Sequence, residues 1–256
     1  MDSAVNLSNV SLAFFYLLLL LPLGVFSRWQ LGLSKVAVIS VLRMTLQLAV
    51  VGIYLQTLFS FQHLGLNLFW LSVMVLVAGF SICRRSGVPL GKATVAVIVG
   101  LLVSLAVVLP PMLIGLIHAD PWWQAQYLIP VSGMLLGNAL TANVLALERW
   151  YSCLKEKSNE YQFYLAMGAP HPVQPFQREA VKAALTPQLA SMSTLGIVAL
   201  PGMMTGQILG GTAPILAVKY QIAIMIAILV AAAVSVATTL GVISRFAFDP
   251  YGRLKL

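Results

Sequence analysis

Charged residues are scarce in this sequence. Only 9% of the 256 residues are Asp, Glu, Lys or Arg, whereas 60% are hydrophobic. Soluble domains carry roughly a quarter charged residues, so this composition excludes an ordinary water-soluble fold. Apolar runs of about 20 residues recur along the chain, which is the length that a helix needs to cross a bilayer. The composition therefore predicts an all-α, polytopic integral membrane protein.

Acidic side chains are absent from the apolar runs. Carriers that are coupled to protons or sodium usually need an ionisable or ion-coordinating group at membrane depth. The acidic residues all fall in loops or at the ends of runs, at Asp2, Asp120, Glu148, Glu156, Glu160, Glu179 and Asp249. This distribution disfavours ion-coupled transport.

The groups that would supply catalysis or capture energy are also missing. Gly87-x-x-x-Gly91-Lys92-Ala93 resembles a nucleotide-binding loop but is one residue short and has Ala where Ser or Thr should hold magnesium. No nucleophile stands with a base, and no pair of carboxylates is apparent. The basic residues are not clustered with aromatic residues, so nucleic acid is not expected as a partner. We expect a protein that is not an enzyme, that has no cofactor, and that takes any driving energy from elsewhere.

Seven membrane spans are expected from the apolar runs. They cover approximately 7–26, 36–60, 64–82, 94–117, 127–147, 184–206 and 220–244. The fourth should be kinked or cut short at Pro110 and Pro111, because proline cannot donate a backbone hydrogen bond. Residues 201–211 could form a short re-entrant segment instead of a simple helix end.

Basic residues set the expected orientation. If the N-terminus lies outside, Arg43 falls within a span and only Lys219 falls outside. The other 13 of the 15 basic residues then lie inside, at Arg28, Lys35, Arg84, Arg85, Lys92, Arg149, Lys155, Lys157, Arg178, Lys182, Arg245, Arg253 and Lys255. Cytoplasmic loops carry an excess of Lys and Arg. We therefore expect a multi-pass protein of the inner (plasma) membrane with its N-terminus outside and its C-terminus inside.

Residues 148–182 form a long polar stretch between apolar runs. Nine of the charged residues lie in it. Before the 168–172 break, aromatic and leucine residues recur at helical spacing, which predicts an amphipathic helix on the membrane surface or against a partner. The alternative is a helix that merely links two spans. We expect the whole chain, 1–256, to be one transmembrane permease domain in which 148–182 is a cytoplasmic coupling segment.

Arg43 is a basic residue inside a predicted span. It lies about two turns into the second span, and Gln47 follows one turn later on the same face. An arginine at the centre of a membrane helix costs about 2.5–3.5 kcal/mol on insertion scales. It could snorkel to the inner headgroups, or it could face the transport path or clamp another helix. Both interpretations stay open.

Small and polar residues gather in the fifth span. Gly133 and Gly137 have the spacing that allows a second membrane helix to approach closely, and Asn138 follows them. Packing alone explains such glycines in most membrane helices. The alternative is that this face borders the transport path.

The sixth predicted span is our candidate for a wall of that path. Pro201 breaks it beside Gly202, and the glycine spacing of the fifth span recurs at Gly206 and Gly210. Broken helices are tolerated in membranes where they line a cavity. The polar residues around the break are Gln188, Ser191, Ser193, Thr194, Thr205 and Gln207.

Four methionines near the polar spans are candidate soft ligands, at Met134, Met192, Met203 and Met204. Thioethers favour Cu(I) and other soft metals. Flexible methionine side chains also fill gaps in apolar cores, which is their commoner use. The histidines are isolated from one another and do not suggest a metal centre. The sequence leaves the metal ligands open.

Several motifs together resemble one known family. They are IPVSGMLLGNA over 129–139, LPGMMTG over 200–206, Arg43-x-x-x-Gln47, Leu165-x-x-Gly168-Ala169, AALTP over 183–187 and KYQI over 219–222. The chain resembles the FetB-type iron-export permeases, a family that also includes plant proteins tied to aluminium tolerance. The resemblance covers nearly the whole chain.

The resemblance implies the permease subunit of an ATP-binding-cassette transporter. Such a subunit works with a separate cytosolic nucleotide-binding ATPase and, in bacterial members, exports iron. We expect two copies to pair through their glycine faces and to couple to the ATPase around Leu165, Gly168 and Ala169. Family members often carry an Asp and a Lys where this chain has Ala190 and Ser193. That departure leaves the substrate open.

Two alternative functions remain. The chain could be a secondary carrier or facilitator that works alone, or an ATP-driven exporter of a substrate other than a metal. The absence of acidic groups in the spans speaks against the first. A membrane-embedded enzyme ranks last, because no catalytic cluster is apparent.

Overall fold

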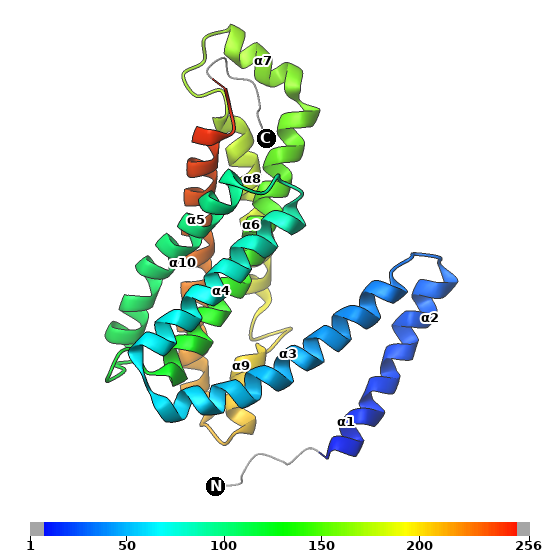
Figure 1. Cartoon of the computed structure of the whole chain (residues 1–256), viewed down its shortest axis with the longest axis vertical. Helices are drawn as coiled ribbons and strands as arrows, with labels where there is room; N and C mark the ends of the chain where they lie inside the picture. The colour runs from blue at the N-terminus through cyan, green and yellow to red at the C-terminus, as the bar shows by residue number, and fades with distance from the viewer. Residues whose placement is uncertain (1–7, 250–256) are drawn as a thin grey trace.

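Most helices of the chain gather in one elongated bundle, with α7 across one end and a slanted hairpin of α1, α2 and α3 to the side (Figure 1). The computed structural model describes residues 8–249. In chain order the elements are α1 Asn9–Tyr16, η1 Leu17–Leu19, α2 Leu20–Arg28, α3 Ser34–Phe61, α4 Leu64–Ser86, α5 Lys92–Pro110, η2 Pro111–Leu116, α6 Ala125–Glu156, α7 Ser158–Ala166, α8 Gln174–Thr194, α9 Gly202–Leu209 and α10 Pro214–Phe246. The all-α prediction is confirmed.

Within residues 8–249, six helical segments are long and apolar enough to cross a membrane. They are Val10–Arg28, Ser34–Phe61, Leu64–Ser86, Lys92–Leu116, Ala125–Glu156 and Pro214–Phe246. Each overlaps one predicted span, so the prediction of a polytopic membrane protein is confirmed. The remaining predicted span, 184–206, is not one helix but parts of α8 and α9 with a break between them.

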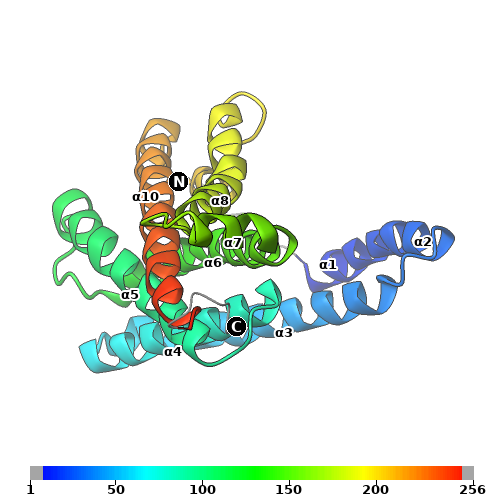
Figure 2. The ribbon, with the colours of Figure 1, turned by 90° about the horizontal axis from the view of Figure 1, so that it is seen from above.

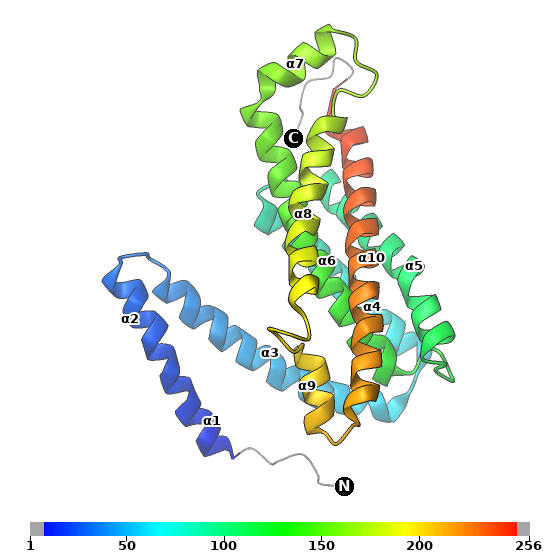
Figure 3. The same ribbon diagram turned by 180° about the vertical axis from the view of Figure 1, so that it is seen from behind.

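The broken pair still connects the two ends of the bundle. Figure 3 shows α8 descending from the end that carries α7, α9 continuing in that direction, and α10 returning beside them. Gly211, with a φ of +91°, lies in the turn between α9 and α10. Residues 201–211 are therefore neither a re-entrant loop nor the end of a single helix. We call the end that carries α7, and that also holds the last turn of α10, the α7 end.

Proline changes the winding of the fourth predicted span without ending it. Helix α5 extends to Pro110, and the chain continues as the wider π-helical turn η2. The helix therefore stays continuous although Pro110 and Pro111 have no backbone N–H to donate, because the local hydrogen-bond pattern changes to that of a π-helix. The span reaches Leu116, as far as the apolar run predicted.

Helices α4, α5, α6, α8 and α10 pack together and enclose the core. α10 is central, because it packs against α5, α6, α8 and α9. Asn143 of α6 is buried and donates a hydrogen bond from Nδ2 to Ser235 Oγ of α10 at 2.7 Å. Trp150, fully buried on α6, continues the core toward the α7 end. This bundle is the frame that positions the broken helix.

The first two spans form a hairpin that stands apart from the bundle (Figure 2), except at the end of α3, where Leu58 is buried against Ala125 and Ile129 of α6. In both spans the most apolar stretch has no buried residue. The two arms share a hydrogen bond between Tyr16 OH and Thr45 Oγ1 at 2.6 Å. Apolar surface on every side of a helix is stable only against lipid or another membrane protein. The hairpin therefore offers a large surface to one of these.

Candidate functional site

The broken helix is interrupted at residues 195–201. Leu195 adopts an extended backbone after the last turn of α8, and Gly196 has a φ of +86°, a conformation that favours glycine. The Gly196 N–H donates to the Ala199 carbonyl at 2.9 Å, which closes a tight loop. Pro201 then begins the turn into α9. The break predicted at Pro201 is present, but it starts earlier, at Leu195.

A cavity of about 470 Å³ lies between this break and α10. Three methionines line it, Met192 from the last turn of α8, Met204 from α9 and Met225 from α10. The remaining walls are mostly aliphatic, apart from Gln221 one turn before Met225. We call this cavity the methionine pocket.

Gln221 is the polar side chain of the methionine pocket. It is only 8% exposed, and its Oε1 has no hydrogen-bond partner among the residues that the structure describes. Gln207 Oε1 on α9 and Gln188 Nε2 on α8 are buried and without partners in the same range. A buried polar atom without a partner costs about 1–3 kcal/mol. These amides therefore favour the entry of water or of a polar cargo beside the break.

The donors at this break are neutral. The described part of the chain contains no group of three or more His, Cys, Asp or Glu residues placed to hold a metal ion. Thioethers and amide oxygens bind hard cations weakly, whereas iron prefers carboxylate, imidazole or thiolate ligands. The methionine pocket can contact a soft ion or a chelated metal in passing. It is not built to retain a hard ion.

The structure brings only part of the predicted path together. Pro201 and Met204 line the methionine pocket, and Met192 joins them. Met203 and Met134 instead pack against the hydrophobic core. Met225 was missed by the sequence analysis, and Gln221 was noted only within a family motif, because nothing in the sequence shows that α10 faces the break.

Other candidate residues lie elsewhere. Thr194, Gly202 and Gly206 are exposed near the break, and Asn138 is exposed on α6, where its Nδ2 donates to Met134 O at 2.9 Å. Arg43 and Gln47 are exposed on α3 in the splayed hairpin. Neither side chain has a hydrogen bond or ion pair within residues 8–249, so their role stays a prediction.

The predicted glycine faces make no close helix contacts inside this chain. A Cβ added at Gly137, Gly202 or Gly206 would meet nothing within 4 Å, and one at Gly133 would touch only the Met74 side chain, at 3.4 Å. These faces are open to a neighbour in the membrane. A close approach of two helix backbones occurs instead at Gly100, where an added Cβ would lie 2.8 Å from the Ser235 carbonyl oxygen.

The polar stretch 148–182 comprises the end of α6, the whole of α7 and the start of α8. Tyr161 of α7 stacks on Phe248 at 5.3 Å between ring centroids and meets Phe176 of α8 edge-on at 6.0 Å. Trp150 meets Phe248 at 6.3 Å. Trp150 and Tyr161 of this stretch therefore pack within the chain itself.

An ion-pair clamp joins α6 to α8 at the α7 end. Arg149 Nη2 donates to Glu179 Oε1 at 2.6 Å, and Lys157 Nζ lies 3.3 Å from Glu179 Oε2. The hydrogen bonds from Arg149 and then Lys157 hold the pKa of Glu179 below its ordinary value. The contact with Glu179 raises the pKa of Lys157. The clamp and the aromatic cluster fix α7 to the bundle.

Two large apolar side chains are exposed at α7, Phe163 on the helix and Met167 at its C-terminal cap. Phe163 is 60% exposed and Met167, one turn later, is 70% exposed. The predicted coupling residue Leu165 is instead half-buried against the core, while Gly168 is exposed with a φ of +69° and Ala169 is half-buried. The sequence analysis missed Phe163 and Met167, because helical spacing does not show which apolar side of α7 faces the core.

Comparison with known proteins places the whole described bundle in one family. The model of the family described as "Uncharacterised protein family (UPF0014)" matches residues 9–248. The membrane protein YjkA of Bacillus subtilis is 32% identical over 234 residues, which cover 88% of this chain and 90% of YjkA. No solved structure shows a significant match.

Two further relatives have names that mention a role. Protein ALUMINUM SENSITIVE 3 of Arabidopsis thaliana is 34% identical over 213 residues, which cover 82% of this chain and 76% of that protein. The probable iron export permease protein FetB of Escherichia coli is 31% identical over 234 residues, which cover 90% of this chain and 88% of FetB. These matches confirm the resemblance inferred from the motifs.

Proposed function

Because the chain belongs to the UPF0014 family of membrane proteins, we propose that it is the permease subunit of an ATP-driven metal exporter. A separate cytosolic ATP-binding-cassette ATPase supplies the energy. The relative named as a probable iron export permease supports the proposal that the substrate is a metal. The absence of acidic residues from the predicted spans supports an external energy source, because ion coupling needs such groups.

The exposed pair Phe163 and Met167 is the observation that carries the proposal. The pair stands on a helix outside the spans, and Tyr161 on the opposite side anchors that helix in the core. Exposed apolar side chains on a rigid support are typical of a protein docking site. The ATPase docks here, and the clamp at Glu179 passes its movement to α8.

Movement of α8 reaches the methionine pocket directly. α8 is one helix from Gln174 to Thr194, so a displacement at its start is carried to the break at 195–201. A loop with Gly196 at its corner can absorb a change in backbone angles, as hinges do. Opening and closing of the pocket by α8 and α9 then gives alternating access to a metal that the neutral donors hold only briefly.

A second copy of the chain completes the transporter in this proposal. The glycines Gly137, Gly202 and Gly206 have open space beside them, and the hairpin of the first two spans has no buried apolar stretch. Small residues let membrane helices approach closely. Two permease subunits that pair through these surfaces would present two α7 helices to two ATPase subunits.

The test is recovery of the ATPase. We expect a tagged native chain, purified from membranes, to bring down a subunit with the ATP-binding-cassette motifs. The double variant Phe163→Ala with Met167→Ala should recover at least about tenfold less of it, because truncating two central apolar contacts removes most of such an interface. The matched control is Leu76→Ala with Phe80→Ala, an exposed apolar pair of the same spacing on α4.

Two results would contradict the proposal. One is recovery of the ATPase by the α7 double variant at the native level. The other is metal transport by vesicles that contain the chain alone, without any ATPase and without added ATP. The second result would favour the stand-alone carrier.

A further inference from the structure

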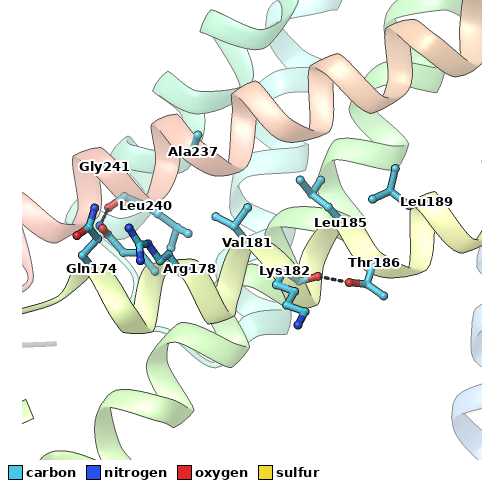
Figure 4. Close-up of a pocket in the computed structure, with 11 residues that line it drawn as sticks. Gln174, Arg178, Val181, Lys182, Leu185, Thr186, Leu189, Ala237, Leu240 and Gly241 are labelled. Atoms are coloured by element: carbon cyan, nitrogen blue, oxygen red, sulfur yellow. Dashed lines mark hydrogen bonds between the residues drawn. The ribbon is translucent and has the colours of Figure 1, made fainter. Parts of the chain in front are cut away.

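A groove runs between α8 and α10 near the α7 end, separate from the methionine pocket. Its volume is about 520 Å³. Figure 4 shows Arg178 beside Gln174 and Leu240 at one end of the groove, with Leu185 and Leu189 at the other. One end is therefore basic and the other aliphatic.

The basic end carries two cations that have no acidic partner. Arg178 and Lys182 are one turn apart on α8, and both are exposed. Within residues 8–249 neither forms an ion pair, whereas Glu179 between them is already bound by Arg149 and Lys157. The positive charge at this end is thus left for a ligand.

The local polar groups of the chain do not compete for that ligand. Gln177 donates from Nε2 to the Leu240 carbonyl at 3.2 Å, and this hydrogen bond links α8 to α10 at the basic end of the groove. Thr186 Oγ1 donates to the Lys182 carbonyl at 2.6 Å, which leaves the Lys182 ammonium group untouched. The two cations remain as the available donors.

The apolar end of the groove is long enough to hold part of an acyl chain. From Lys182 to Leu189 the helix rises by roughly 10 Å. Leu185 and Leu189 of α8 and Ala237 of α10 line this part. A surface that is basic at the water side and aliphatic toward the bilayer fits an amphiphile with an anionic head, and basic pockets between membrane helices bind acidic lipids in this way.

We propose that the groove between α8 and α10 binds an anionic phospholipid of the leaflet at the α7 end. Its phosphate lies at Arg178 and Lys182, and one acyl chain follows Leu185 and Leu189. Such a lipid would join α8 to α10 above the break. It would therefore set how freely α8 moves, whatever substrate the protein carries.

The experiment measures lipid binding to the purified chain in detergent by native mass spectrometry and by thermal stabilisation. The probes are a phosphatidylglycerol, a phosphatidylcholine with the same acyl chains, and inorganic phosphate. We expect phosphatidylglycerol to bind and to raise the Tm, and the other two to do neither. Arg178→Gln with Lys182→Gln should weaken phosphatidylglycerol binding roughly 30-fold, from the usual contribution of two basic residues near acidic lipid.

Three further variants keep the test decisive. Arg178→Lys with Lys182→Arg keeps the charges and should retain binding, which excludes misfolding as the cause of a loss. Leu185→Trp fills the apolar end and should weaken binding although both cations remain. The control Arg84→Gln with Arg85→Gln removes an exposed basic pair at the end of α4 and should leave binding unchanged.

Several outcomes would overturn the proposal. Equal stabilisation by phosphatidylcholine would mean that the cations play no part, and binding of inorganic phosphate as tight as that of phosphatidylglycerol would mean that the acyl chain plays none. Equal losses in the α4 control would indicate non-specific attraction. Loss of ATPase recovery in the Arg178 and Lys182 variant, with lipid binding unchanged, would assign these cations to a protein partner.

Discussion

Glu179 of α8 is the residue that joins three segments at the α7 end, namely α6, the α6–α7 junction and α8. Its two carboxylate oxygens accept hydrogen bonds from Arg149 on α6 and from Lys157 at the junction between α6 and α7. Those contacts hold the pKa of Glu179 below its ordinary value. Because the carboxylate is partly exposed, the energy of the clamp is small. Its importance is geometric, because it fixes the start of α8 relative to α7.

The pH dependence of this clamp has a definite sign. A depressed folded pKa gives stability that is present above the unfolded pKa of about 4.3 and is lost as the pH falls through the folded value. We expect the difference in Tm between the native chain and Glu179→Gln to be constant from about pH 5 to pH 8 and to shrink below about pH 4. Thermal unfolding in detergent across that range measures it.

The comparison needs a carboxylate without such partners. Glu156 is exposed near the same junction and forms no ion pair in the part of the chain that the structure describes. Glu156→Gln should therefore change the Tm little at any pH. If Glu179→Gln behaves in the same way, the clamp contributes nothing to stability.

At the residue scale the sequence predicted the break better than the pocket. Pro201 and Met204 were identified, because a proline and a methionine pair among polar residues stand out in an apolar run. Met225 lies in an ordinary apolar helix, and only the packing of α10 on α9 brings it to the pocket. Residues that become functional through tertiary contact carry no local pattern.

At the scale of elements, the contact between α5 and α10 depends on one glycine. A Cβ at Gly100 would lie 2.8 Å from the Ser235 carbonyl oxygen and would collide with the Thr239 side chain. A backbone carbonyl cannot rotate away, so one of the two helices must shift. We expect Gly100→Ala to destabilise the protein by about 1–3 kcal/mol, the usual cost of overpacking. Thermal unfolding in detergent would show it as a lower Tm.

A matched glycine on α3 provides the comparison. Gly52 also lies inside a membrane helix, but a Cβ there would meet nothing within 4 Å. Gly52→Ala should keep or slightly raise the Tm, because alanine favours helix more than glycine does. An unchanged Tm for Gly100→Ala would mean that α5 and α10 separate easily, contrary to the packing described here.

Helix positions were predictable where apolar runs end in loop-forming residues. The third predicted span, 64–82, corresponds to Leu64–Ser86, which ends at Gly87 with a φ of +68°. The loop at 195–201 was not fully predictable. Five of its seven residues are Leu, Ile, Val or Ala, so composition alone suggests a continuous helix. Only Gly196, which adopts a φ of +86°, and Pro201 mark the interruption in the sequence, and the break starts six residues before that proline.

At the scale of the whole molecule, the proposal depends on which side of the membrane the α7 end faces. Nine of the basic residues that the structure describes lie on the bundle elements at this end, whereas Lys219 lies near the opposite end. The nine are Arg84, Arg85, Lys92, Arg149, Lys155, Lys157, Arg178, Lys182 and Arg245. The excess of Lys and Arg in cytoplasmic segments predicts that the α7 end is inside.

Cysteine labelling tests this orientation. Cys83 and Cys153 are both buried and free, so replacing them with alanine gives an unreactive background. Ser158 at the α7 end and His63 at the opposite end are exposed sites for a new cysteine. In intact cells a membrane-impermeant maleimide should label the His63→Cys variant at once. The Ser158→Cys variant should react only after the membrane is permeabilised, because α7 then lies on the side where ATP is found.

The reverse pattern would remove the basis for ATPase docking. If the Ser158→Cys variant reacts in intact cells, Phe163 and Met167 face a compartment without ATP, and no cytosolic subunit can reach them. The apolar face of α7 would then need an external partner, and the phospholipid of the α8–α10 groove would come from the outer leaflet. One labelling experiment therefore decides whether α7 faces a cytosolic ATPase or an external partner. For this reason the orientation should be measured before any of the other predictions is tested.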